Sequence, residues 1–252
     1  MFKRIQFIEL QDLAALPHII RDGVTSYLEF LLRVFKIYDP VHLSIKEVLK
    51  DRPINRIIDL CSGGGGPSLN MANYFKDTPI LLTDLYPNLS AFKKAAQISN
   101  IDYINFSVNA LDYKFQKGDL LTLYTAFHHF NDGDAKKLIQ NAVASQSSIC
   151  ISEFVQRDLK SIALVLPSPI GMLFLMPLVR PFQLSRLFFT YIIPLIPFVT
   201  LWDILVTVLR IRTKSELMEM VKDIDHYEWH YIERRTSLFL KVTSFIGVPK
   251  NA

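Results

Sequence analysis

The chain has 252 residues, and half of them are hydrophobic, which suits one large domain or one domain with an embedded lid. Its formal net charge is +4, and the basic residues are scattered without a dense run, which disfavours a nucleic-acid partner. The two cysteines, Cys61 and Cys150, are too few for a disulfide framework or a four-cysteine metal site. We therefore expect a reducing, cytoplasmic location and no bound metal.

The first 52 residues have apolar residues at spacings of three and four, which is typical of helices. We expect a helix over residues 12–20, another over residues 23–37 and a short one over residues 42–50. The pair Asp39-Pro40 separates the last two. The basic start of the chain is typical of a signal peptide, but four polar residues interrupt the apolar stretch, so we expect no secretory signal. These residues are Gln6, Glu9, Gln11 and Asp12.

Strand and helix patterns alternate in the middle of the chain. Short apolar runs predict strands over residues 56–60, 80–83, 103–108, 120–125 and 148–154. Amphipathic runs predict helices over residues 67–74, 90–99 and 134–145. This alternation indicates a parallel sheet that helices cover on both faces.

The C-terminal part of the chain returns to a regular pattern. Thr213 with Glu216 three residues later is typical of a capping box, which predicts a helix over residues 213–224. Residues 227–233 and 238–246 then alternate as two closing strands.

A glycine-rich loop follows the first predicted strand, in the run Asp59-Leu60-Cys61-Ser62-Gly63-Gly64-Gly65-Gly66-Pro67. A strand that ends in such a loop and opens a helix brings backbone N–H groups close to a ligand. Glycine is needed there because side chains would block the approach, and because some positions require positive φ.

Three binding modes compete for this loop. A phosphate-binding P-loop requires Lys and Ser or Thr after the last glycine, and Pro67-Ser68-Leu69 stands there instead. The dinucleotide fingerprint fits poorly, because its sixth position would be Ser68 or Leu69. An S-adenosylmethionine loop needs an acid at the strand end and then Gly-x-Gly.

The third mode agrees with the residues present. Asp59 ends the strand, and Gly63 and Gly65 supply the Gly-x-Gly spacing. Asp84 ends the second predicted strand, where a carboxylate can hold the two ribose hydroxyls of the cofactor. The ordered series of strand, loop, helix, strand and acid makes this combination far more specific than a glycine cluster alone.

The chain resembles the class I S-adenosylmethionine-dependent methyltransferases over residues 55–155. The segment Thr125-Ala126-Phe127-His128-His129-Phe130, together with the glycine loop and residues 191–203, is similar to a bacterial subgroup. The resemblance implies an α/β fold with a doubly wound, mostly parallel seven-stranded sheet and an apolar insert after strand five. It also implies S-adenosyl-L-methionine as the cofactor, but it names no acceptor.

From the pattern along the chain we expect an N-terminal helical lid, residues 1–52, and a methyltransferase domain, residues 53–252, with an apolar helical insert at 158–212. Arg21 and Asp22 would belong either to a lid over the cofactor or to a solvated helix face, and we favour the solvated face.

Further cofactor contacts follow from the same resemblance. The family places an acid or amide after the third strand to meet the adenine amino group, and this chain has Asn109 there, with Asp112 as a second candidate. Neighbouring positions complete the expected cofactor set: Cys61, Leu85, Ala110 and Thr125. For Cys61, a packing role is the alternative.

Candidate catalytic residues should follow the strands that end beside the cofactor. His128 and His129 follow the fourth strand, where one could act as a base or orient the acceptor; alternatively, one packs and the other caps the next helix. Glu153 could bind an amine or take a proton, or pair with Arg157. Neither cysteine follows a proline, and no Asp/Asn-Pro-Pro-aromatic run exists, which disfavours methylation of cytosine carbon and of amide or adenine nitrogen.

The segment 161–210 contains two charge-free runs, 162–179 and 187–202, each near the lower length limit of about 17 residues for crossing a bilayer. Six prolines interrupt them, whereas flanking arginines and aromatic residues suit a membrane interface. The prolines are 167, 169, 177, 181, 194 and 197. We favour a lid that also contacts a membrane peripherally over a lid of a soluble enzyme, and both over two true spans.

Three functions remain open at this stage. The favoured one is methyl transfer to a small-molecule acceptor of apolar or lipid-like character, in the cytoplasm at the inner face of a membrane. The alternatives are a non-catalytic, membrane-associated protein that binds S-adenosylmethionine, and an RNA methyltransferase, which only the mild basicity supports.

Overall fold

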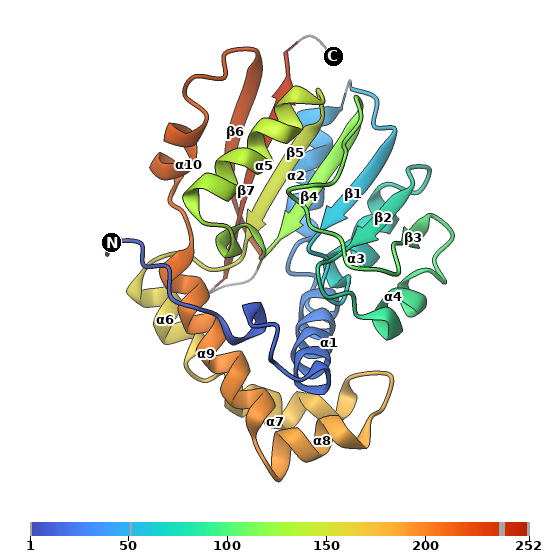
Figure 1. Ribbon diagram of the computed structural model, residues 1–252, viewed down its shortest axis with the longest axis vertical. Helices are drawn as coiled ribbons and strands as arrows, with labels where there is room; N and C mark the ends of the chain where they lie inside the picture. The colour runs from blue at the N-terminus through green and yellow to red at the C-terminus, as the bar shows by residue number, and fades with distance from the viewer. Residues whose placement is uncertain (1, 51, 237–239, 251–252) are drawn as a thin grey trace.

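The computed structural model describes residues 2–50, 52–236 and 240–250 (Figure 1). In these residues a seven-stranded sheet has the order β3-β2-β1-β4-β5-β7-β6. Its strands are β1 (Arg56–Leu60), β2 (Ile80–Thr83), β3 (Ile101–Tyr103), β4 (Asp119–Tyr124), β5 (Ser148–Glu153), β6 (Tyr227–Arg235) and β7 (Lys241–Pro249). The first five strands are parallel, and β7 runs antiparallel to both β5 and β6. The mostly parallel seven-stranded sheet that the resemblance implied is confirmed.

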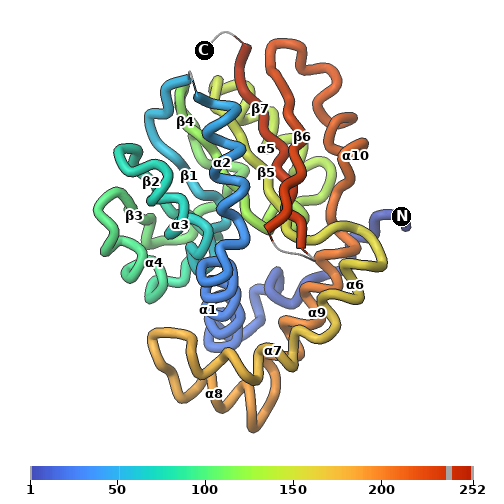
Figure 2. Tube along the Cα trace, turned by 180° about the vertical axis from the view of Figure 1, so that it is seen from behind, coloured from blue at the N-terminus to red at the C-terminus, as the bar shows by residue number. Residues whose placement is uncertain are grey.

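Helices cover both faces of the sheet. The helices of this part are α2 (Asp39–Leu49), α3 (Gly66–Tyr74), α4 (Leu89–Ala95), α5 (Asp132–Ala144) and α10 (Lys214–Met220). Apolar residues of α2, α3 and α4 pack on one face, and those of α5 and α10 pack on the other, as the two opposite views show (Figures 1 and 2). Every residue of the central strand β4 is therefore buried, as expected for a strand covered on both sides.

The remaining helices lie at the carboxyl ends of the parallel strands (Figure 1). They are α1 (His18–Val34), α6 (Leu159–Val165), α7 (Ser168–Leu175), α8 (Leu184–Tyr191) and α9 (Leu195–Arg210), with short 3-10 turns at η1 (Leu10–Asp12), η2 (Phe127–His129) and η3 (Met176–Leu178). A separate apolar core joins α1 to the insert helices α7 and α9. The edge of the sheet where parallel strands place ligands is thus covered by α1, the insert and the N-terminal segment.

Local sequence signals predicted several elements correctly. β1 and β2 have the predicted bounds, and the capping box of Thr213 and Glu216 begins α10 as expected. The Thr213 hydroxyl accepts a hydrogen bond from the Glu216 amide, and the Glu216 carboxylate accepts one from the Thr213 amide. Both signals depend on residues within a few positions of each other, so tertiary contacts do not override them.

Three predicted elements need correction. The helix over 12–20 is wrong, because α1 begins only at His18, after Pro17, which stands at its N-cap. The strand over 103–108 is also wrong: β3 ends at Tyr103, and the Val108 amide instead donates a hydrogen bond to the Asp84 carbonyl. In the last predicted strand, residues 238 and 239 lie outside the described residues, and β7 continues to Pro249.

The residues before α1 form an extended segment, residues 2–17, which we call the N-terminal strap. It runs beside α9: the Ile5 amide bonds to the Leu209 carbonyl, and Asp203 of α9 accepts hydrogen bonds from the Leu10 and Gln11 amides at 2.6 and 3.1 Å. The insert therefore holds the strap in place at the carboxyl edge of the sheet.

Candidate active site

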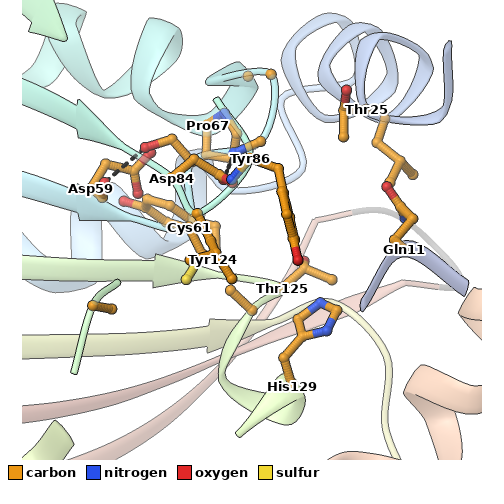
Figure 3. A pocket seen from close by; sticks show the side chains of 18 of the residues that line it. Gln11, Thr25, Asp59, Cys61, Pro67, Asp84, Tyr86, Tyr124, Thr125 and His129 are labelled. Carbon is orange, nitrogen blue, oxygen red and sulfur yellow. Dashed lines mark hydrogen bonds between the residues drawn. The ribbon is translucent and has the colours of Figure 1, made fainter. Parts of the chain in front are cut away.

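A cavity of about 410 Å³ lies at the carboxyl ends of β1, β2 and β4 (Figure 3). The wall includes the glycine loop, the loop after β2, residues 108–111, the ends of β4 and β5, the η2 turn, and a cover made by α1 and the strap. Its size falls in the range of cavities that hold a cofactor-sized ligand. The switch in strand order between β1 and β4 is where an open parallel sheet forms its binding crevice.

Asp59 holds the glycine loop in place through hydrogen bonds. The carboxylate is buried and accepts hydrogen bonds from the Ser68 hydroxyl at 2.7 Å and the Thr122 hydroxyl at 3.0 Å. The Ser62 hydroxyl donates to the Asp59 carbonyl, which closes the turn. Burial raises the pKa of Asp59 to about 6, although the hydroxyl donors oppose this shift.

Glycine is required in the loop for two different reasons. Gly63 and Gly65 have φ of 56° and 73°, in the left-handed region that favours glycine. At Gly64 an added Cβ would lie 2.6 Å from Glu29 Cβ, and at Gly66 it would lie 2.7 Å from the Glu29 carbonyl oxygen. The loop therefore turns sharply and also lets helix α1 pack directly against it.

Asp84 joins the loop to the second strand. Its carboxylate accepts hydrogen bonds from the Gly63 and Tyr86 amides, both at 2.7 Å, and it lines the cavity (Figure 3). Burial raises the pKa of Asp84, while the two backbone donors lower it. Each carboxylate oxygen has a second lone pair, so Asp84 can still accept bonds from a ligand diol.

The residues expected near the adenine divide between the cavity wall and the surface. Asn109 and Ala110 line it, whereas Asp112 is exposed and does not. The Asn109 side-chain oxygen accepts a bond from the Leu111 amide, and its NH₂ group donates to Asp112 at 2.8 Å. Asp112 thus fixes the orientation of the Asn109 amide without lining the cavity itself.

The other predicted cofactor residues divide in the same way. Cys61, Leu85 and Thr125 line the cavity, whereas Gly65 does not and serves as the N-cap of α3. Thr125 has φ of 50°, and its hydroxyl is hydrogen-bonded to the Tyr38 hydroxyl. Burial raises the pKa of the Cys61 thiol well above its usual value, so this side chain stays a neutral packing group.

The two histidines of the η2 turn have different surroundings. His129 lines the cavity, whereas His128 is only 2% exposed and does not reach the wall. His128 lies between two carboxylates, with Nδ1 3.0 Å from Glu153 and Nε2 3.3 Å from Glu9. Neither histidine caps α5, because Asn131 does so.

Glu153 also stands away from the cavity wall. Its partner is His128, and the alternative pairing with Arg157 is not formed, because Arg157 pairs with Glu216 at 2.9 Å. Burial alone would lower the pKa of His128, but Glu153 and Glu9 raise it to about 10. His128 is therefore an imidazolium at neutral pH, held between two acids.

Glu9 and Asp12 of the strap complete this cluster, although no motif in the sequence pointed to them. Asp12 Oδ1 lies 2.6 Å from His129 Nδ1, and Arg210 of α9 contacts both Asp12 and Glu9, at 2.7 and 3.2 Å. Burial alone would raise the pKa of Glu9, but His129, His128 and Arg210 lower it to about 2. The cluster links the insert, the strap and the cavity wall.

Glu9, His128 and His129 offer ligand atoms within 4.8 Å of one another, a set that could hold a metal ion. One oxygen of Glu9 already accepts a bond from the Thr207 hydroxyl at 3.1 Å and pairs with Arg210. His128 and Arg210 thus already pair with Glu9 among the side chains themselves.

Helix α1 contributes a further part of the cavity wall. The Arg21 guanidinium lies 4.1 Å from the centre of the Tyr86 ring, and both residues line the cavity. Arg21 is buried, so the interpretation of this residue as part of a solvated helix face is wrong. Tyr86 was not singled out in the sequence, although it lies only two positions after Asp84.

Solved structures with the same arrangement of strands and helices carry methyltransferase names. A Nostoc punctiforme protein assigned as an O-methyltransferase has a TM-score of 0.57 at 12% identity, over 92% of this chain and 62% of that protein. The plantazolicin methyltransferase BpumL, solved with SAH and a desmethyl plantazolicin analogue, has a TM-score of 0.55 at 11% identity, over 92% and 97% of the two chains. The fold is that of the class I S-adenosylmethionine-dependent methyltransferases.

A third structure with the methyltransferase fold is the magnesium protoporphyrin IX methyltransferase of Synechocystis with bound SAH. Its TM-score is 0.51 at 14% identity, over 94% of this chain and 88% of that protein. Identities this low show the methyltransferase fold and leave the acceptor open. This chain spans about three fifths of the Nostoc protein's length. No protein-family model and no curated protein sequence matches the chain.

Proposed function

We propose that this protein transfers a methyl group from S-adenosylmethionine to a small acceptor of apolar or lipid-like character. The observation that carries the proposal is the pairing of Asp84 with Gly63. It places a carboxylate and a glycine loop with positive φ side by side on the wall of one cavity. A carboxylate beside a glycine loop suits a ligand with two neighbouring hydroxyls, which the carboxylate can accept from, and a charged part, which the loop amides can approach.

The residues present fit this cofactor. Asp84 would accept hydrogen bonds from the ribose hydroxyls, and Asn109 would lie near the adenine, while Gly63 and Gly64 let the ligand approach the backbone closely. The bound cofactor supplies an activated methyl group, so the protein mainly has to position the acceptor and exclude water.

His129 is the residue that we propose as the base for a protonated acceptor. It lines the cavity, and its Nδ1 is held by Asp12, which fixes the orientation of the imidazole. His128 and Glu153 would then be positioning residues: as a buried ion pair they hold the η2 turn that carries His129.

The character of the acceptor is inferred from the cavity and from the insert beside it. Leu28, Leu32 and Phe154 contribute apolar wall, next to the polar groups of the glycine loop. Both cysteines are free, which supports a cytoplasmic location. The apolar insert supports contact with the inner face of a membrane, a source of acceptors of this kind.

Calorimetric titration with S-adenosylhomocysteine tests the cofactor half of the proposal. We expect saturable binding to the wild-type protein and affinity about 10- to 100-fold weaker for Asp84→Ala, because charge-assisted bonds to two hydroxyls are lost. Asp77→Ala is the matched control, since Asp77 is exposed and does not line the cavity. Absence of binding to the wild-type protein, or equal affinity of all three, would show that the cavity is not a cofactor site.

A further inference from the structure

The apolar insert exposes large hydrophobic side chains at the tip formed by α7 and α8, which lies at the bottom of the molecule in Figures 1 and 2. The side chain of Phe174 is 77% exposed and that of Leu184 is 76% exposed. We define the docking face by six exposed residues: Ile170, Phe174, Leu178, Phe182, Leu184 and Ile192. An exposed apolar group of this extent marks an interaction surface rather than ordinary solvent-facing structure.

The exposed charges of the insert have one sign. No acidic residue occurs in residues 159–202, and Arg180, between Leu178 and Phe182 of the docking face, is exposed. Tyr191 and Trp202 are partly exposed, and aromatic side chains with a polar end prefer the headgroup level of a bilayer. An apolar face with an exposed arginine and no acid in its segment is complementary to an anionic lipid surface.

Length and packing together limit the way in which the insert can meet a bilayer. The segment Leu159–Leu178 has 20 residues and is long and apolar enough to cross, with 17% of its best window buried. As one helix its 20 residues would reach about 30 Å, the thickness of the hydrocarbon, so length alone does not decide. However, Met172 and Met176 on its inner side are buried against α1, so the segment is packed on the enzyme. A segment held in this way suits contact in the plane of the interface.

The second helix pair leads to the same conclusion. α8 and α9 are long and apolar enough to cross a bilayer only when they are taken together, and the chain bends by 72° between them. One side of α9 carries Asp203, Thr207 and Arg210, which are buried in the polar cluster with the strap and cannot enter hydrocarbon. The insert is therefore folded onto the enzyme and offers the bilayer only its outer side.

The strap lies between α9 of the insert and the cavity. The Trp202 indole donates a hydrogen bond to the Ile8 carbonyl at 3.1 Å, and the Phe7 and Ile8 side chains are exposed. Gln11 and Asp12 of the same strap line the cavity. A bilayer that also reaches the partly exposed Trp202 would lie next to the segment that covers the cavity.

We propose that the docking face binds in the plane of an anionic bilayer surface, and that an acceptor dissolved in the bilayer reaches the cavity past the strap. The first part rests only on the insert. The second part rests on the proposed function, because it names the bilayer as the source of the acceptor.

Vesicle flotation of the full chain tests the docking face. We expect the wild-type protein to float with vesicles of phosphatidylcholine and phosphatidylglycerol, and less with phosphatidylcholine alone. Phe174→Glu with Leu184→Glu should reduce binding at least about tenfold, because two exposed apolar groups become charged. Arg180→Glu should reduce binding to the anionic vesicles about fivefold, because Arg180 is the exposed basic residue between Leu178 and Phe182.

Phe106→Glu is the matched control, since Phe106 is 65% exposed but lies between β3 and β4, outside the insert. It should bind vesicles like the wild type. S-adenosylhomocysteine titration of the same samples separates the two proposals: variants that lose the vesicles should keep the cofactor, and weak cofactor binding alone contradicts only the proposed function.

Three results would contradict the proposal that the docking face binds a bilayer. One is a wild-type protein that binds neither vesicle, and another is an equal loss of binding for Phe106→Glu. The third is a dimer, measured by analytical ultracentrifugation without lipid, that Phe174→Glu with Leu184→Glu dissociates while wild-type vesicle binding is absent. That outcome would assign the face to a second copy of this chain.

Discussion

Asp12 Oδ1 lies 2.6 Å from His129 Nδ1, so a residue of the N-terminal strap holds a histidine of the cavity wall across 117 positions of the sequence. Arg210 contacts the other oxygen of Asp12 at 2.7 Å and donates a hydrogen bond to the His129 carbonyl. The strap, the insert and the cavity are therefore one connected unit, and the orientation of His129 depends on all three.

Substitution of His129 should affect chemistry more than cofactor binding. We expect His129→Gln to lower kcat about 10²- to 10⁴-fold, the usual contribution of a positioned base, with little change in the affinity for S-adenosylhomocysteine. Asp12→Asn should lower kcat less, because the imidazole remains but loses its charged partner. His230→Gln, at a partly exposed position of β6 away from the cavity wall, should match the wild type. Equal kcat for His129→Gln and the wild type would exclude a base at this position.

The glycine loop should tolerate no side chain where α1 packs on it. Gly66→Ala places a Cβ against the Glu29 backbone, and we expect it to lower the free energy of unfolding by about 1–3 kcal/mol, as other overpacking substitutions do. Gly171→Ala in α7 meets nothing within 4 Å and should raise that free energy by up to about 1 kcal/mol, because alanine favours the helix. Urea denaturation measures both. Equal effects at the two positions would contradict the close approach of α1 to the loop.

The buried cluster makes stability depend on pH in a defined window. The folded-state pKa of His128 is about 10 against an ordinary 6.5, so its contribution is complete below pH 6.5 and is lost as the pH rises through 10. The folded-state pKa of Glu9 is about 2 against 4.5, so its contribution is complete above pH 4.5 and is lost as the pH falls through 2. These two groups together favour the folded protein most between pH 4.5 and 6.5.

Removal of His128 tests the alkaline side of this window. The wild-type free energy of unfolding should fall between pH 6.5 and 10, with a slope of at most about 1.4 kcal/mol per pH unit for this one proton. His128→Gln should be less stable at pH 6 and should show a smaller slope. Denaturation at several pH values measures the slope of the free energy of unfolding against pH. The same slope for the variant and the wild type would contradict the assignment of His128 as a charged imidazolium.

Asp203 should control the order of the strap. Its carboxylate accepts the Leu10 and Gln11 amides, so Asp203→Ala should speed hydrogen exchange at these two amides about tenfold or more. Asp225→Ala, at an exposed site before β6, is the control and should leave the exchange unchanged. Unchanged exchange in Asp203→Ala would mean that other contacts, such as the Ile5 amide to Leu209, suffice to hold the strap.

The sequence predicted the parts of the site that depend on neighbouring residues. Gly63 and Asp84 were identified because each follows directly on a recognisable strand, and parallel strands bring their carboxyl ends together. Glu9 and Asp12 could not be found in this way, because their partners lie more than 100 positions away and no local pattern records such a contact.

Three predicted residues show that a residue's position after a strand does not by itself tell whether its side chain reaches the cavity. His128 and His129 are adjacent in the chain, but only the fold shows that one enters a buried ion pair and the other reaches the cavity. Asp112 was a candidate because an acid suits the third strand, yet that strand ends at Tyr103 and Asp112 lies in an exposed turn.

Methyl transfer from labelled S-adenosylmethionine tests the central proposal most directly. The wild-type protein is incubated with separate lipid, polar-metabolite and RNA fractions of a bacterial extract, with Asp84→Ala and Asp77→Ala run in parallel. We predict label in the lipid fraction, a strong reduction with Asp84→Ala and no change with Asp77→Ala. Label confined to RNA would contradict the proposed acceptor class, and no label in any fraction from a protein that binds the cofactor would favour a non-catalytic binding protein.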